Sequence, residues 1–230
     1  MKKIGIIGGL SWESSRKYYS KINRKINRRL GGNNSAEIIL YSLNFKDIEK
    51  LQSKGKWNKV YEKIKMAGKS LERADADFII IASNTIHKIY PELASSLKVP
   101  IYHIVDALES RIKRLSKVAI LGTSITLSDE FITGRIEKKY NVEVLKPPSE
   151  KIEIVNKIIF KNLVKGIINK DVEKEFQDVL KYFLKKEVKY VILACTELQM
   201  LIKNNKFFNR FNFIDTLEEH CNLAVEKSLT

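Results

Sequence analysis

The chain has 230 residues, of which 44% are hydrophobic and 30% charged, and its 42 lysines and arginines against 27 aspartates and glutamates give a net charge of +15. This composition excludes a wholly disordered chain, and no apolar run approaches the ~18 residues that a membrane-spanning helix needs. We therefore expect a cytoplasmic protein with no membrane partner and enough residues to bury one large core or two smaller ones.

Short apolar runs alternate with amphipathic segments along the whole chain. Their hydrophobicity is continuous, which predicts strands buried on both faces of a parallel sheet. These runs are residues 3–8, 37–43, 77–82, 101–104, 118–122 and 190–194. Between them, residues 57–71 and 176–183 carry apolar side chains at the three- and four-residue spacing of helices. The alternation predicts right-handed βαβ units and an α/β fold.

Three segments of the first half reappear in the second half in the same order. The pairs are KIGIIGG at 3–9 with KVAILGT at 117–123, DFIIIASNT at 77–85 with KYVILACTE at 189–197, and VDALES at 105–110 with IDTLEE at 214–219. Their offsets of 114, 112 and 109 residues are nearly equal, which predicts two pseudo-symmetric α/β lobes. The third segment directly precedes the second copy, and its partner lies near residue 230, so we expect each lobe to exchange its final element with the other. The expected lobes are residues 1–98 with 212–230, and residues 99–211.

The two copies of one strand are followed by different polar residues. Ser83 follows the first copy and Cys195 the second. Ligands of open parallel sheets bind beyond the carboxyl ends of the strands, so we expect Ser83 and Cys195 on opposite sides of a cleft between the lobes. A thiol at a helix N-terminus has its thiolate favoured, which makes Cys195 a candidate nucleophile or carbon base. The alternative is a small buried core residue, an interpretation that fits Cys221 better.

The residues at these positions resemble those of the aspartate/glutamate racemase family. The resemblance covers essentially the whole chain. GIIGG opens the chain at residues 5–9, and LSWES at residues 10–14 is similar to one branch of the family. The first active-site motif, Cys-Asn-Thr-x-His, corresponds to SNTIH at 83–87, and the second, Cys-Thr-Glu, to CTE at 195–197. The resemblance implies a homodimeric isomerase that acts on a small amino acid without pyridoxal phosphate.

The resemblance also implies a reaction with two acid–base groups. A thiolate removes the α-proton from one face of the substrate and a thiol returns a proton on the other. Here Ser83 replaces the first cysteine, and a hydroxyl is a far poorer base than a thiolate. We therefore expect slow net racemisation, with α-proton exchange retained better for the L enantiomer, on which Cys195 acts.

Further residues carry over from the family by their place beside these motifs. Asn84, Thr85 and Thr196 are similar to residues that hold the substrate's α-carboxylate, and Lys165 resembles a lysine that pairs with its acidic side chain. Gln52, Thr123 and Thr126 follow predicted strands and are expected to add donors at the same rim. His87 and Glu197 are candidates for orienting the hydroxyl and the thiol, or are residues that only satisfy a helix start. The family's arginine after the second strand has no clear counterpart, Lys46 being nearest, so strict aspartate or glutamate specificity is not expected.

Several alternatives differ in class from a racemase. A cofactor-free decarboxylase or a cis–trans isomerase of small diacids would also use Cys195, and a binding protein could keep the cleft without the reaction. The sequence has neither GxGxxG nor a phosphate loop, and no set of ligands at metal-binding spacing, so we expect no organic cofactor and no metal. The scattered lysines predict no specific nucleic-acid partner, although their field would attract a dicarboxylate.

Overall fold

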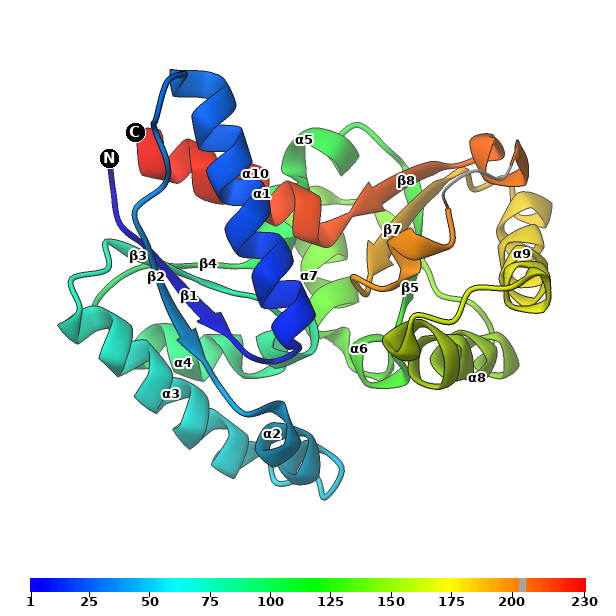
Figure 1. The fold of residues 1–230 in the computed structure, drawn as a ribbon. Coiled ribbons are helices and arrows are strands. Elements are labelled where there is room, and N and C mark those ends of the chain that lie inside the picture. Colours follow the sequence, from blue (N-terminus) through cyan, green and yellow to red (C-terminus); the bar gives the residue numbers. More distant parts are fainter. Residues whose placement is uncertain (203–205) are drawn as a thin grey trace. The chain divides into compact units, whose positions relative to one another are not determined.

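The computed structural model describes residues 1–202 and 206–230. Within the first range, it describes the backbone of Lys165 but not the side chain. The chain divides into two compact units, which we call unit 1 (Met1–Ala107 and Leu217–Thr230) and unit 2 (Leu108–Thr216). The lobe boundaries expected from the repeat, after residues 98 and 211, stay a prediction. Figure 1 shows the elements of both units, with the colours following the sequence.

Unit 1 contains a four-stranded parallel sheet in the order β2-β1-β3-β4. Its strands are β1 (Ile4–Gly8), β2 (Ile38–Ser42), β3 (Phe78–Ile81) and β4 (Ile101–Tyr102). Its helices are α1 (Trp12–Leu30), α2 (Phe45–Gln52), α3 (Trp57–Arg73), α4 (Tyr90–Ser96) and α10 (Thr216–Leu229), with 3-10 helices η1 (Thr85–Ile89) and η2 (Ile104–Leu108). β1 and β3 are central and completely buried, as their apolar sequences predict.

Alternate residues of the central strands face two separate hydrophobic layers in unit 1. Ile7 and Ile81 belong to one cluster with the buried stripe of α3, which includes Ile64. Ile4 and Ile6 belong to the other, with side chains from α1 and α10. In Figure 1, α1 and α10 cover one face of this sheet, and α3 and α4 cover the other. Helix α10 therefore supplies part of one hydrophobic layer of unit 1, although it follows unit 2 in the sequence.

The strand β2 corrects one expectation from the sequence. Residues 37–43 are apolar enough to predict a strand buried on both faces, but Leu40, Tyr41 and Ser42 are exposed. Among the described strands, β2 pairs only with β1 and lies at the edge of the sheet, so that its other side pairs with no described strand. Its apolar residues are therefore not evidence of a central position.

Unit 2 repeats the arrangement with the order β6-β5-β7-β8, again parallel. Its strands are β5 (Lys117–Gly122), β6 (Glu143–Leu145), β7 (Tyr190–Ala194) and β8 (Asn212–Asp215). Its helices are α5 (Glu109–Ile112), α6 (Ser124–Ser128), α7 (Glu130–Tyr140), α8 (Ser149–Lys157) and α9 (Lys170–Lys185), with the π-helix η3 (Ile158–Asn162) and the 3-10 helices η4 (Leu163–Lys165), η5 (Leu198–Met200) and η6 (Lys206–Arg210). The apolar pattern of the sequence does not predict β6 and β8, because both strands are short and carry charged or amide residues.

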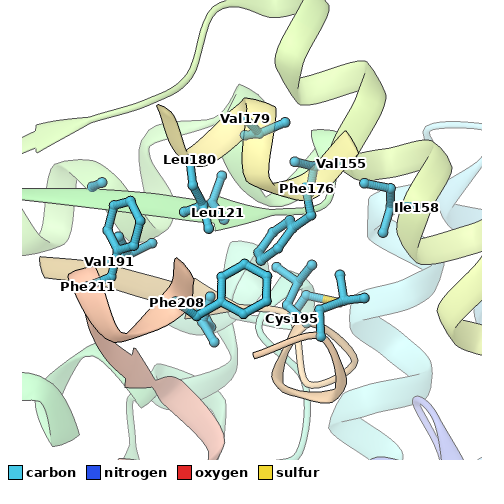
Figure 2. Close-up of a cluster of buried hydrophobic side chains, with 14 of the residues drawn as sticks. Leu121, Val155, Ile158, Phe176, Val179, Leu180, Val191, Cys195, Phe208 and Phe211 are labelled. Carbon is cyan, nitrogen blue, oxygen red and sulfur yellow. The ribbon is translucent and has the colours of Figure 1, made fainter. Parts of the chain in front are cut away.

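The core of unit 2 lies where α9 packs against β5 and β7. The apolar stripe of α9, which includes Phe176 and Leu180, is completely buried, as its spacing predicts. Figure 2 shows this cluster, to which Phe208 and Cys195 also belong. Within the described residues, every helix is too short or too polar to span a bilayer.

Candidate functional site

The first candidate group lies directly after β3 in unit 1. The backbone turns at once, because the Ser83 N–H donates to the Ile81 carbonyl at 2.8 Å, and η1 begins two residues later. Ser83 is half-buried, whereas Asn84 is 7% exposed. The polar residues predicted from the first motif therefore leave the sheet at its carboxyl edge, where ligands of parallel sheets bind.

His87 connects this turn to the beginning of η2. Its Nδ1 lies 2.7 Å from the Ser83 carbonyl oxygen, and its Nε2 lies 3.2 Å from the Ile104 N–H. A carbonyl can only accept and an N–H can only donate, so Nδ1 carries the proton and the ring is neutral. His87 thus contacts the backbone of Ser83, and the orienting role predicted for it stays a prediction.

The three histidines of the chain form one buried cluster in unit 1. The ring centroid of His87 lies 4.4 Å from that of His103 and 6.0 Å from that of His220, and all three are at most 2% exposed. His220 Nε2 donates to the Tyr102 carbonyl at 3.1 Å, while its Nδ1 lies 3.0 Å from the Tyr18 hydroxyl. Burial lowers the pKa of His220 to about 4, although the Tyr102 carbonyl and Asp106 act in the opposite direction.

We expect His220 to make unit 1 less stable in acid. An unfolded histidine takes up a proton near pH 6.5, whereas folded His220 stays neutral to about pH 4, so the unfolded state is favoured as the pH falls between these values. Protonation of the unfolded histidine lowers the free energy of unfolding by up to about 3 kcal/mol. In His220→Gln, an amide can keep both hydrogen bonds without titrating, and urea unfolding at pH 7 and pH 5 should show a smaller loss. An equal pH dependence in both proteins would contradict the assignment.

The glycine-rich opening forms a close backbone contact with the residue that follows β2. Gly9 has a φ of +73°, and a Cβ built there would collide with the backbone of Leu43. Its N–H donates to Ser15 Oγ at 2.8 Å, and Ser11 caps α1. Gly9, Ser11 and Ser15 therefore stabilise the tight turn of the backbone from β1 to α1.

The second candidate group lies directly after β7 in unit 2. Cys195 is 8% exposed, and its Sγ donates to Glu197 Oε2 at 3.0 Å. The Thr196 hydroxyl donates to the same oxygen at 2.8 Å. One carboxylate oxygen therefore receives hydrogen bonds from both side chains that precede it.

The expected helix N-terminus at Cys195 is corrected by the structure. The next helix is η5, a 3-10 helix of three residues that begins only at Leu198. So short a helix has no substantial macrodipole, and the sulfur instead contacts a carboxylate. The chemistry of Cys195 must therefore be explained from Glu197 and not from a helix dipole.

The remaining predicted residues lie at several places in the two units. Thr123 follows β5 and caps α6, with its Oγ1 2.9 Å from Thr126 Oγ1, and Asn156, which the sequence patterns did not single out, accepts from the Ser124 N–H at 3.2 Å. Gln52 ends α2 in unit 1. Lys165 ends η4, and its side chain lies outside the described part of the structure. Asn156 could have been found only by knowing that α8 packs on α6.

The registers of the two sheets give Ser83 and Cys195 equivalent places. Ile7 pairs with Ile81 in unit 1, and Leu121 pairs with Leu193 in unit 2. The second pair lies 114 and 112 residues after the first, the same offsets as in the repeated segments. Ser83 follows Ile81 by two residues, as Cys195 follows Leu193. Within each unit, the candidate group thus stands at the same position of the sheet.

The fold and the two groups define an α/β protein with a duplicated parallel sheet and a polar motif after the third strand of each copy. A family model described as Asp/Glu/Hydantoin racemase matches residues 7–224. The chain belongs to this racemase family. Among the described residues, no group of three or more His, Cys, Asp or Glu side chains could hold a metal ion.

Solved structures agree with this assignment. A candidate Asp/Glu racemase from Yersinia pestis is 36% identical, covers 100% of both chains and has a TM-score of 0.93. An aspartate racemase homologue from Pyrococcus horikoshii OT3 is 34% identical, also over 100% of both chains, with a TM-score of 0.83. Picrophilus torridus aspartate racemase, at 21% identity over 99% of this chain and 94% of its own, shares the fold with a TM-score of 0.76.

Proposed function

We propose that the protein is a cofactor-independent amino-acid racemase that acts on substrates similar to aspartate and glutamate. The main support is the equivalent position of Ser83 and Cys195 in two sheets with matching register. A reaction that inverts a stereocentre needs acid–base groups on two faces of one carbon, and a duplicated fold supplies two groups at equivalent positions of their sheets. The family match and the aspartate racemase homologue add support for this substrate class.

In this proposal Cys195 acts on one face of the α-carbon and Ser83 on the other. Cys195 removes the α-proton of the L enantiomer, and Ser83 delivers a proton to the opposite face directly or through a water molecule. In the reverse direction, Ser83 has to act as a base, which a hydroxyl does poorly near neutral pH. We therefore propose slow net racemisation and faster α-proton exchange for the L enantiomer.

The other predicted residues would bind or orient the substrate. Asn84, Thr85 and Thr196 adjoin the acid–base groups and are proposed to hold the α-carboxylate, with further donors from Gln52, Thr123 and Thr126. Lys165 is proposed to pair with the acidic side chain. His87, which bonds to the Ser83 carbonyl, is proposed to orient that residue. The proposal includes a homodimer in the cytoplasm and a reaction without pyridoxal phosphate.

Replacing Cys195 by alanine tests the proposal. We expect the α-proton exchange of L-aspartate and L-glutamate in heavy water, followed by proton NMR, to fall by about 10²- to 10⁴-fold, the usual worth of a general base. The same substitution at Cys221, a buried core residue of α10, is the matched control and should leave exchange unchanged. Undiminished exchange in Cys195→Ala would reject the proposal. Turnover of malonate- or maleate-type diacids, with no exchange of amino acids, would favour the decarboxylase or isomerase alternative.

A further inference from the structure

We infer that Glu197 is a catalytic proton acceptor, which takes the thiol proton of Cys195 as the sulfur takes the α-proton of the substrate. The observation is the 3.0 Å contact from Cys195 Sγ to Glu197 Oε2. A thiol cannot remove another proton until it loses its own, and this oxygen is in position to receive it. Because the step belongs to the reaction proposed above, this inference rests on the proposed function.

The surroundings of Glu197 support acceptance of a proton. The Thr196 hydroxyl donates to the same Oε2 at 2.8 Å, which fixes the oxygen next to the sulfur. Both Cys195 and Glu197 are partly removed from solvent, so water competes less for the contact. The carboxylate is therefore held in the geometry that direct proton transfer requires.

The repeat supplies an independent observation. With the offset of 112 residues, Ser83 corresponds to Cys195, Asn84 to Thr196, and Thr85 to Glu197. The carboxylate thus occurs in the copy that has the thiol, and threonine takes its place in the copy that has serine. A carboxylate is useful beside a thiol that must lose its proton to act as a base, and the copy with serine, which is proposed to act poorly as a base, has no carboxylate at this position.

The proposed step balances as follows. The bond from the α-carbon to its hydrogen breaks, its electron pair stays on the carbon, and the proton forms a new S–H bond. The old S–H bond breaks and its proton passes to Glu197 Oε2. Cys195 ends as a thiol, Glu197 ends as a carboxylic acid, and the negative charge has moved from the carboxylate to the substrate. In water a thiol is a weaker acid than a carboxylic acid by about four pH units, so transfer of both protons together avoids a free thiolate.

The test compares pH profiles of L-aspartate α-proton exchange in the full-length wild type, Glu197→Gln and Glu197→Asp. We expect Glu197→Gln to lose about 100-fold at pH 7 and to recover roughly tenfold per pH unit towards pH ~8.5, where a thiol ionises unaided. Glu197→Asp should keep the wild-type profile shape. Glu175→Gln is the matched control, because Glu175 forms an exposed ion pair with Lys157 elsewhere in unit 2. A deficit that is the same at every pH, or no deficit, would overturn the inference.

Alkylation of Cys195 by iodoacetamide, mapped by mass spectrometry, gives a readout that needs no turnover. Removing the negative charge beside the sulfur favours its thiolate, so Glu197→Gln should react several-fold faster than the wild type at pH 7. A merely structural Glu197 would not combine faster alkylation with slower exchange, and unchanged or slower alkylation would overturn the inference. If the wild type exchanges no amino acid but alkylation accelerates in Glu197→Gln, the proposed function fails while the coupling of Glu197 to the thiol proton is supported.

Discussion

Replacing Ser83 by cysteine is expected to raise the α-proton exchange of D-aspartate by about 10²- to 10⁴-fold, the range by which a competent general base accelerates proton transfer. A thiol is somewhat larger than the hydroxyl but ionises several pH units lower, so the Ser83 position gains a usable base. Exchange of L-aspartate should change far less, because Cys195 removes its proton in the proposed mechanism. Proton NMR of each enantiomer in heavy water measures both rates.

This variant has a further signature in its pH dependence. Thr85 takes the place of Glu197 in unit 1, so the new thiol has no equivalent carboxylate and the gain should grow towards pH ~8.5. Net racemisation must keep equal catalytic efficiency in both directions, since the enantiomers have equal free energy. Ser95→Cys is the control, because Ser95 is exposed on α4. Equal gains for the two enantiomers, or none for the D form, would contradict the asymmetric assignment.

Replacing Gly9 by alanine is expected to lower the free energy of unfolding by about 3 kcal/mol or more. The left-handed φ costs an L residue about 1–2 kcal/mol, and the added Cβ collides with the backbone of Leu43, which cannot rotate away as a side chain could. The loss is a large fraction of the 5–15 kcal/mol that stabilises a typical domain. Urea unfolding followed by circular dichroism measures it.

Gly55 provides the matched control for this substitution. It also has a left-handed φ, of +64°, but a Cβ built there meets no atom within 4 Å. Gly55→Ala should therefore lose only the conformational part of the stability, and the difference between the two variants measures the collision with Leu43. Equal losses in the free energy of unfolding of both variants would show that the collision with Leu43 does not add to the loss at Gly9.

The sequence correctly predicts those features of the fold that are determined by short stretches of the chain. The collinear repeat is confirmed as two parallel sheets of the same order, and the buried stripe of α3 follows from its spacing. Other features depend on the path of the chain in space. The exposure of β2 follows from its edge position, and the hydrogen bond from Cys195 to Glu197 requires the turn that replaces the expected helix.

The histidine cluster also depends on the path of the chain in space, and here the residues lie farther apart in the sequence. His87, His103 and His220 share no motif, and His220 comes from a helix 117 residues after His103. Only the return of α10 to unit 1 brings it to the others. No periodicity or short motif encodes such a contact, because it depends on which sheet the last helix covers.

The helix α10 also fixes the order in which the two units can finish folding during synthesis. Leu217, Ala224 and Val225 pack against the β1 face of unit 1, yet they are translated more than a hundred residues after Ala107. Unit 2 is a continuous segment and can bury its own core first. Residues 1–107 of unit 1 are synthesised earlier, but they keep an incomplete apolar face until residues 217–230 emerge from the ribosome.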